Sequence, residues 1–213
     1  PDSMNGQGGG MSNSDDTKLL YLGDDYDSYS HIFDNATFSI TDADKDRLIA
    51  SIKQLNEGAN LEEVLDIDAV IRYFVVHNFV LNGDSYTGNM IHNYYLYVLS
   101  MIPWDYNLAF GGFSSGGDAT SLVNYPIDDP LLSGQMEDRP MLSWIFEEDT
   151  YLERYHQLFD EFITTYFESG AFEEMYTNTL ALISPYVEAD TTSFTTYETY
   201  QKASEALKEN NTI

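Results

Sequence analysis

The stretch of sequence that decides the fold runs from His77 to Asn89 and reads HNFVLNGDSYTGN. The preceding segment, 66–81, overlaps the start of this stretch, and its apolar residues recur at helical spacing. Towards residue 81 they cover the helix almost all the way round. Such a pattern predicts a helix at the centre of the core. The residues at 82–85, Asn-Gly-Asp-Ser, are typical of a turn and disfavour a continued helix. The stretch therefore predicts a buried helix that leads directly into a polar loop.

A short β-hairpin is predicted after this loop. Residues 90–97 and 99–102 are rich in β-branched and aromatic side chains, and Pro103 closes the second segment. The connection at 97–99 (Tyr-Val-Leu) contains no Gly, Asn or Asp, the residues that tight hairpin turns favour. Either this connection is irregular, or turn residues are missing from the sequence.

Three polar side chains are expected to meet at the open end of the hairpin. The outer ends of paired strands lie side by side, so Asn89 at the entry and Asp105 past the exit should be neighbours. Asp84 lies one loop away, and we expect its carboxylate to face solvent in the same pocket. Carboxylate and amide oxygens suit a hard cation such as Mg²⁺, which keeps waters or substrate phosphates as its other ligands.

The order of these residues also matches a known catalytic arrangement. In protein kinases a catalytic Asp is followed five residues later by a metal-binding Asn, and a metal-binding Asp follows a short hairpin. Here Asn89 stands five residues after Asp84, and Asp105 follows the predicted hairpin. The Asp-x-x-x-x-Asn spacing alone arises by chance in a chain this acidic. The hypothesis of phosphoryl transfer therefore rests on the complete order.

An amphipathic helix is predicted between Thr41 and Gly58. Thr41 is a suitable N-cap, Asp44 stands at the third helical position, and Gly58 ends the apolar periodicity. The aspartates of this segment also mimic the start of a calcium-binding loop. Arg47 and Lys53 stand where such a loop needs Gly and Glu, so we reject an EF-hand.

The rest of the chain predicts a flexible start, a long loop and further helices. Residues 1–16 are rich in Gly and favour a linker over a phosphate-binding loop, because no strand precedes them. Residues 105–138 contain scattered Gly and Pro, and a loop of this length is often functional. Helical periodicity follows, with an apolar stripe at 152–166 that should face the core, a helix at 172–187 and a weaker one reaching Lys208.

The composition excludes several classes of function. The 36 acidic and nine basic residues give a net charge of −27, which disfavours binding to nucleic acid and to anionic membranes. This charge favours either a cationic partner or a solvated acidic surface. The chain has no cysteine for disulfides, metal sites or catalysis, and no apolar run reaches the roughly 18 residues of a membrane-spanning helix. The four histidines share no metal-ligand spacing and are interpreted as structural.

Four segments resemble signature stretches of one protein family. They read VVHNFVLNGDSYTGNMIHNYYLY (75–97), LSMIPWDYNLAFGGF (99–113), ATSLVNYPID (119–128) and RPMLSWIF (139–146). Together they resemble the CotH family of spore-coat and secreted proteins, which are atypical protein kinases. The similarity extends from about Leu19 to beyond Glu198.

The resemblance implies a fold, an activity and a set of site residues. The implied fold is α+β and mostly helical, and it covers residues 17–213. It is similar to the carboxy-terminal lobe of a protein kinase, with a short hairpin that carries the active-site loops. The implied activity is transfer of the ATP γ-phosphate to serine. By position, Asp84 resembles the catalytic residue, Asn89 and Asp105 resemble ligands of Mg²⁺ or Mn²⁺, and Asn107 is a candidate for a further polar contact.

The resemblance and the charge together suggest where the protein acts and on what. We expect a serine-rich, basic protein substrate and a location outside the cell, at the cell surface or on the spore coat. Neither nucleic-acid binding nor membrane insertion is expected.

The sequence departs from ordinary kinases at three places. No Arg precedes Asp84, so the usual anchor for a phosphorylated activation loop is absent, and Tyr106-Asn107 replaces the Phe-Gly that usually follows the metal-binding Asp. No strand predicted before residue 60 offers the Lys that grips the ATP phosphates. We therefore expect the chain to be the carboxy-terminal half of the kinase, without the amino-terminal nucleotide-gripping lobe and inactive by itself.

Two other classes of function stay open. One is a noncatalytic surface or scaffold module with a kinase-like fold. The other is a carbohydrate-active or carbohydrate-binding domain, since 17 tyrosines and two tryptophans could line a sugar cleft and paired carboxylates can hydrolyse glycosides. Such aromatic residues more often fill a core.

Overall fold

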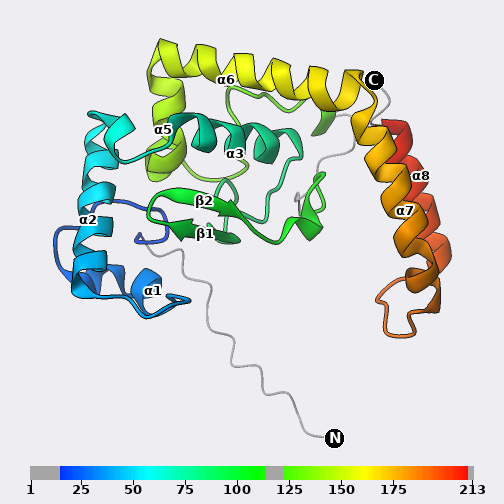
Figure 1. The fold of residues 1–213 in the computed structure, drawn as a ribbon, viewed down its shortest axis with the longest axis horizontal. Helices are drawn as coiled ribbons and strands as arrows, with labels where there is room; N and C mark the ends of the chain where they lie inside the picture. Colours follow the sequence, from blue (N-terminus) through cyan, green and yellow to red (C-terminus); the bar gives the residue numbers. More distant parts are fainter. Residues whose placement is uncertain (1–14, 114–121, 211–213) are drawn as a thin grey trace, which may run out of the picture. The chain divides into compact units, whose positions relative to one another are not determined.

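The computed structural model describes residues 15–113 and 122–210, which are drawn in colour in Figure 1. The chain divides into two units, one ending at Tyr155 and one beginning at His156. The linker expected at 1–16 lies outside the described residues except for its last two positions. Part of the long loop expected at 105–138 lies outside them as well.

Helix α2 spans Asp42–Glu57 and has the predicted ends. The Thr41 hydroxyl accepts a hydrogen bond from the Asp44 backbone N–H at 3.3 Å, and the Asp44 carboxylate accepts one from the Thr41 N–H at 2.9 Å. This reciprocal capping box satisfies two donors at the helix end. Gly58 then adopts a left-handed conformation with a φ of 66° and ends the helix. The predicted amphipathic helix is confirmed.

The core of the first unit is built around helix α3, Ile67–Phe79, as the sequence predicts. Asp66 caps this helix by accepting a hydrogen bond from the Ala69 N–H at 3.1 Å. Helix α5, Pro140–Glu147, packs against α3. Fully buried side chains on the two helices include Ile71, Phe74, Met141, Leu142 and Ile145. The predicted buried helix is therefore present, and it ends at Phe79, two residues before the predicted end at 81.

The predicted hairpin is present, with β1 at Tyr94–Tyr97 and β2 at Ser100–Pro103. Its first strand begins four residues after the predicted start at 90, because Ile91 and Asn93 have positive φ angles that do not fit a strand. The strands are antiparallel and are joined by a two-residue turn at 98–99. Val98 has a φ of 55°, so a β-branched residue adopts the left-handed backbone that such turns require. The chain closes the turn without additional residues. In Figure 1, α3 lies over this hairpin.

The remaining elements of the first unit are short. They are η1 (Tyr26–Tyr29), α1 (Ser30–Phe33), η2 (Leu61–Glu63), η3 (Tyr106–Leu108) and η4 (Met136–Asp138). The described residues are therefore mostly helical with a two-stranded antiparallel sheet, which agrees with the predicted α+β class. Across these residues, none of the helices combines the length and apolarity needed to cross a membrane.

Helix α6, Asp149–Phe162, continues into a π-helical segment, Ile163–Glu168. Tyr155 is fully buried, as the apolar stripe predicts. Tyr166, at the end of the stripe, is 47% exposed, so the prediction that the whole stripe faces the core is wrong there. A π-helix has more residues per turn than an α-helix, and this change rotates the later side chains away from the stripe.

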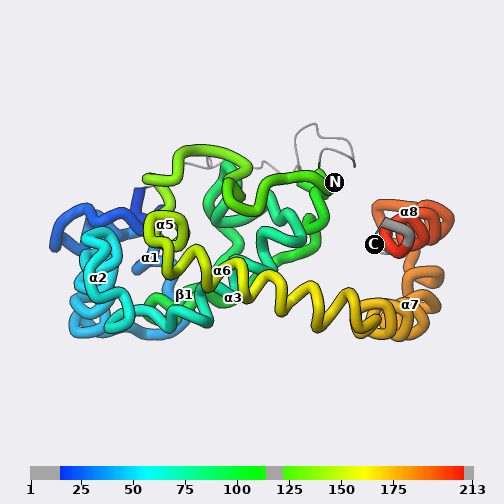
Figure 2. The backbone as a smooth tube through the Cα atoms, turned by 90° about the horizontal axis from the view of Figure 1, so that it is seen from above, coloured from blue at the N-terminus to red at the C-terminus, as the bar shows by residue number. Residues whose placement is uncertain are grey.

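The second unit contains helices α7, Ala171–Ala189, and α8, Tyr197–Asn210, which lie side by side in Figures 1 and 2. The Tyr176 hydroxyl donates to the Ser204 carbonyl oxygen at 2.9 Å. An ion pair between Lys208 and Glu173 spans 3.2 Å. These contacts make the two helices antiparallel. The sequence predicts both of them.

Replacing Thr41 with Ala removes the hydroxyl that caps α2. We expect the free energy of unfolding to fall by about 1 kcal/mol, the typical effect of losing an N-cap Thr. Urea denaturation followed by circular dichroism measures the change. Thr177→Ala on the exposed face of α7 is the control and should cause no loss. Equal stability of Thr41→Ala and the wild type would show that the capping box does not stabilise the fold.

Candidate functional site

The segment at residues 80–89, which we name the Asp84 loop, is mostly polar, and its central part is buried. Every residue from Asn82 to Gly88 is buried, and Asn82 and Ser85 are 0% exposed. Backbone N–H and C=O groups in such a loop need partners within the protein, because water cannot reach them. The Ser85 hydroxyl satisfies one of them by donating to the Asn82 carbonyl oxygen at 2.5 Å.

Arg139, directly before α5, satisfies further carbonyl groups of this loop. Its side chain is among the largest that are almost completely buried, with 2% exposure. Its Nε donates to the carbonyl oxygen of Tyr86 at 2.7 Å, and its Nη2 donates to those of Gly88 at 3.0 Å and Ser133 at 3.2 Å. Burial lowers the pKa of this guanidinium from its ordinary value. The buried cation fixes the path of the backbone between the two candidate residues of the loop.

The loop doubles back tightly at Gly88. A side-chain carbon at this position would lie 1.8 Å from the carbonyl oxygen of Gly83, far inside van der Waals contact. Glycine is therefore the residue that fits without displacing the backbone. This close approach brings together the two glycines that flank Asp84 in the sequence.

The Asp84 carboxylate is held by two residues from the segment before β1. His92 Nε2 lies 2.6 Å from Asp84 Oδ1. The Asn93 side-chain amide donates to Asp84 Oδ2 at 3.1 Å and to the Asp84 carbonyl oxygen at 2.9 Å. Asp84 is 7% exposed, so the expectation that its carboxylate faces solvent is wrong. The physical reason is that the chain after the loop folds back over this carboxylate.

Neither His92 nor Asn93 is among the residues predicted for the site. His92 belongs to the histidines that the sequence marks as structural, because they share no metal-ligand spacing. The available signal is the His-Asn pair in the short gap between Asn89 and the first strand. Spacing along the chain does not reveal that this pair turns back onto Asp84.

The segment after the hairpin, residues 104–113, is attached to the Asp84 loop. The Phe110 N–H donates to the Val80 carbonyl oxygen at 2.5 Å. The Gly111 N–H donates to the Leu81 carbonyl oxygen at 3.3 Å. The bases of the two loops are therefore in direct contact.

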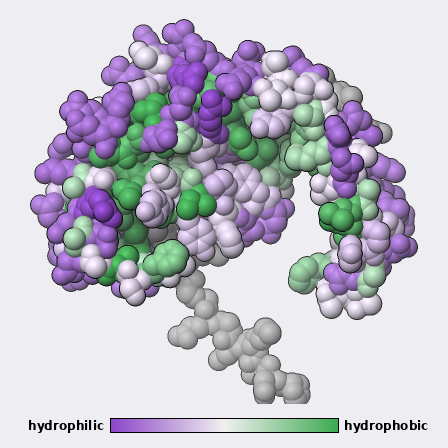
Figure 3. All heavy atoms as spheres, viewed as in Figure 1, coloured by the Kyte–Doolittle hydropathy of each residue, from purple (hydrophilic) through white to green (hydrophobic). Residues whose placement is uncertain are grey.

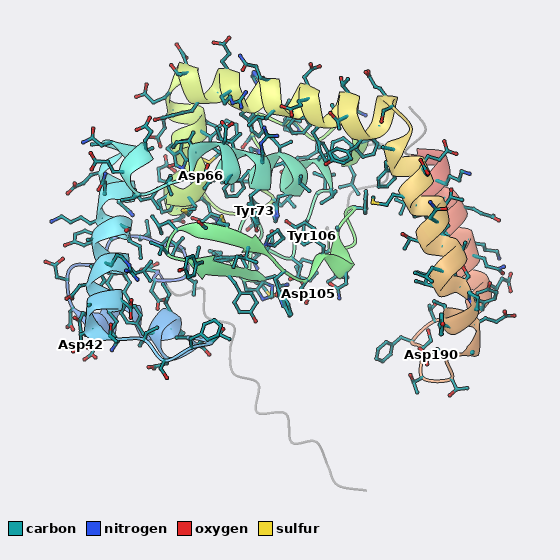
Figure 4. All side chains as sticks on the ribbon, viewed as in Figure 1. Asp42, Asp66, Tyr73, Asp105, Tyr106 and Asp190 are labelled. Carbon is teal, nitrogen blue, oxygen red and sulfur yellow. The ribbon has the colours of Figure 1, made fainter. Side chains whose placement is uncertain are left out.

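The three remaining candidate residues are exposed. Asn89 accepts a hydrogen bond from the Ser133 hydroxyl at 3.4 Å. Asp105 has a left-handed backbone with a φ of 54° directly before η3, and Asn107 lies within that turn. Figure 4 shows Tyr106 on the side of the chain that faces α3, with Asp105 on the other side. The close approach of Asn89 and Asp105 that a shared metal ion requires stays a prediction.

His77, near the end of α3, connects the helix to both loops. Its Nε2 lies 2.6 Å from the Ser85 hydroxyl oxygen and 3.1 Å from that of Thr87, and its Nδ1 lies 3.1 Å from the Tyr106 hydroxyl. Because the Ser85 hydroxyl donates to Asn82, Nε2 carries the imidazole proton and Nδ1 accepts from Tyr106. Burial lowers the pKa of His77 to about 3 and raises the pKa of Tyr106 to about 12. His77 is therefore a neutral, structural histidine, as predicted.

Backbone strain is concentrated in this region. A positive φ is uncommon for residues other than glycine and costs on the order of 1–3 kcal/mol. Between the end of α3 and the end of the second loop, it occurs at Leu81, Ile91, Asn93, Val98, Asp105 and Phe110. Such conformations persist where the surrounding contacts over-determine them, and they cluster at functional sites.

Replacing Arg139 with Lys should destabilise the fold, because one ammonium group cannot match the fixed fork of the guanidinium. Each buried acceptor left without a donor costs about 1–3 kcal/mol, so we expect the free energy of unfolding to fall by at least this amount. Chemical denaturation measures the loss. The control is Arg47→Lys, since Arg47 pairs with Asp44 at the surface. Equal stability of the two variants would contradict the role of Arg139.

The contribution of His77 to stability should weaken on acidification. In the unfolded chain its imidazole binds a proton near the ordinary pKa of about 6.5, whereas folded His77 stays neutral down to about pH 3. Between these values the unfolded state binds more protons, so stability falls with falling pH. The stability advantage of the wild type over His77→Gln should shrink by about 2 kcal/mol from pH 7 to pH 5. Denaturation curves at both pH values measure it, and parallel pH dependences would mean that His77 binds its proton equally well in the folded and the unfolded state.

Comparison with known proteins identifies the family of this chain. No match was found among the curated proteins or among the solved structures. The family described as CotH kinase protein matches residues 6–210, and this match includes the Asp84 loop, the hairpin and all helices from α1 to α8. Because the match covers nearly the whole sequence, the chain belongs to the CotH kinase protein family.

Proposed function

We propose that this protein is an atypical protein kinase of the CotH type, which transfers the ATP γ-phosphate to serine on secreted or spore-coat proteins. One observation carries the proposal: Asp84, Asn89 and Asp105 follow the kinase order around a hairpin, and Asp84 lies on a buried loop held by Arg139. Membership of the CotH kinase family supports it.

Asp84 is the proposed catalytic residue, which orients the acceptor serine and takes its proton. The serine oxygen forms a bond to the γ-phosphorus, the bond from that phosphorus to the β–γ bridging oxygen breaks, and ADP leaves. The hydroxyl proton passes to the Asp84 carboxylate. A carboxylate has about four acceptor positions, and His92 and Asn93 use one on each oxygen. Asp84 therefore retains acceptor capacity for the substrate hydroxyl.

Asn89 and Asp105 are the proposed ligands of Mg²⁺ or Mn²⁺, and Asn107 is a candidate for a further contact. Mg²⁺ in phosphoryl-transfer sites takes one or two carboxylates together with phosphate oxygens and waters. An exposed carboxylate and an exposed amide fit this donor chemistry. When bound, the ion would neutralise charge on the phosphates. Residues 15–113 and 122–210 contain no group of three or more His, Asp or Glu side chains that could hold a metal by itself. The proposal accordingly includes ATP oxygens as ligands.

The nucleotide grip is assigned to a different part of the protein. Kinases hold the ATP phosphates with a strand Lys paired to a helix Glu. The strands of the described residues, β1 and β2, contain no Lys. We therefore propose that residues 17–213 supply the substrate and metal side, and that an amino-terminal lobe supplies the grip. Residues 17–213 alone should then be inactive, and transfer assays need the full-length protein.

The proposed substrate is a serine-rich, basic protein. The chain carries 36 acidic and nine basic residues, and Figure 3 shows hydrophilic side chains over much of the visible face. Complementary charge accelerates association and disfavours wrong partners. The same acidity argues against nucleic acid and anionic membranes as partners. Membership of the CotH family supports a location at the spore coat or cell surface.

Carbohydrate binding is the second candidate function. Tyr95, Tyr97 and Trp104 are 45%, 76% and 54% exposed at the hairpin. Tyr95 and Trp104 pack edge to face with their ring centroids 5.2 Å apart. Exposed aromatic rings of this kind can stack on sugars. Glycan binding without phosphate transfer would favour this function, and the absence of both activities would favour a noncatalytic scaffold.

Replacing Asp84 with Asn should leave the fold intact and remove most phosphoryl transfer. Asn has nearly the same size but cannot take the serine proton, and losing a positioned base lowers the rate roughly 10²- to 10⁴-fold. The assay follows ³²P from γ-labelled ATP into the full-length protein itself and into a serine-rich basic peptide, with Mg²⁺ or Mn²⁺. Circular dichroism and thermal unfolding check the fold.

The matched control is Asp160→Asn, an exposed change on α6. Near-normal turnover by a correctly folded Asp84→Asn variant would remove Asp84 from the proposed role. A wild-type protein that transfers no phosphate in any of these assays would instead overturn the kinase function and leave the two noncatalytic classes.

A further inference from the structure

We propose that His92 is a positioning residue, which holds the Asp84 carboxylate in the orientation needed for phosphoryl transfer; this inference rests on the function proposed above. His92 Nε2 lies 2.6 Å from Asp84 Oδ1. An ionised carboxylate can only accept hydrogen bonds, so Nε2 carries a proton and donates it. A hydrogen bond to a charged acceptor is stronger than one between neutral groups. The imidazole therefore selects one orientation of the carboxylate.

Asn93 restrains the same carboxylate from the next position in the chain. Its amide nitrogen donates to Asp84 Oδ2 at 3.1 Å and to the Asp84 backbone carbonyl oxygen at 2.9 Å. Each carboxylate oxygen thus accepts one hydrogen bond from this pair of residues. Rotation about the last side-chain bond of Asp84 would break both bonds. The two donors together fix the plane of the carboxylate as well as its direction.

The backbone around His92 holds this contact against conformational strain. Ile91 and Asn93, on either side of it, have φ angles of 48° and 56°. A positive φ is an outlier for a β-branched residue such as Ile. The Ile91 side chain is 3% exposed, and its burial anchors the strained segment. The strained backbone turns both polar side chains towards Asp84, and strain of this kind is typical of functional sites.

The exposure of His92 also favours a role in the site over a role in packing. Its side chain is 36% exposed, whereas that of Asp84 is 10% exposed. His77, the structural histidine of this region, is 1% exposed. A histidine that served the core alone would resemble His77. His92 instead lies at the surface and reaches inward to a single carboxylate.

Loss of the imidazole donor should slow the chemical step and leave ATP binding nearly unchanged. His92 acts through Asp84, and Asp84 acts on the serine hydroxyl. A displacement of about 1 Å in a catalytic group can lower the rate 10²-fold. We therefore expect the effect in kcat, with little change in the KM for ATP.

The experiment compares His92→Phe with His92→Gln in the full-length protein. Phe keeps the ring volume and has no donor, whereas the Gln amide can donate from nearly the position of Nε2. We expect kcat to fall about 10²-fold in His92→Phe. In His92→Gln, kcat should be at least roughly tenfold higher than in His92→Phe. His156→Phe, an exposed change on α6, is the control. Thermal unfolding verifies that every variant is folded.

The outcomes separate this inference from the proposed function. If the wild type transfers phosphate and His92→Phe keeps the full rate, or if the Phe and Gln variants lose equally, the positioning role is overturned and the kinase function stands. If the wild type transfers none, both are overturned. The contact is also read directly by ¹⁵N NMR of selectively labelled histidine. The His92 Nε2 resonance should shift in Asp84→Asn, and an unchanged resonance would show that the hydrogen bond is absent.

Discussion

The hydrogen bonds of the buried Arg139 guanidinium hold the backbone on which the candidate site is built. A loop that is buried from Asn82 to Gly88 must satisfy its carbonyl groups inside the protein. Arg139 reaches those of Tyr86 and Gly88 from the start of α5. A guanidinium can do this because it presents several donors at fixed angles. Movement of the loop would leave the two carbonyl groups without donors and would remove two hydrogen bonds from the buried charge, and such a loss is destabilising.

Polar contacts extend from this support to the rest of the site. His77 links the end of α3 to the Asp84 loop and to Tyr106 in the second loop. Backbone hydrogen bonds from Phe110 and Gly111 join the two loops at their bases. Burial keeps His77 neutral, so one ring nitrogen donates to the Asp84 loop and the other accepts from Tyr106. The helix, the hairpin and the two loops are thereby held as one arrangement before any ligand binds.

The site combines a fixed carboxylate with exposed candidate ligands. Asp84 is nearly buried and receives hydrogen bonds on both oxygens, whereas Asn89 and Asp105 lie at the surface. This division suits the proposed phosphoryl transfer, in which the protein contributes mainly positioning and electrostatic stabilisation. A catalytic carboxylate needs a fixed geometry. Ligands of a metal that arrives with ATP need access to solvent. The positive φ angles around the loops show that the fold maintains this geometry at a cost in backbone energy.

The sequence by itself determined the capped helix α2, the buried helix α3, the hairpin, the order of the candidate residues and the family. These features depend on signals that act across a few neighbouring residues, such as caps and apolar periodicity. Only the tertiary structure decided which residues support the site. Arg139 lies 53 positions from the Tyr86 carbonyl that it binds. His92 reaches Asp84 because its neighbours Ile91 and Asn93 adopt left-handed backbone angles, which a β-branched residue such as Ile91 disfavours. Long-range partners and strained angles depend on the packing of the complete fold, and local residue preferences do not specify them.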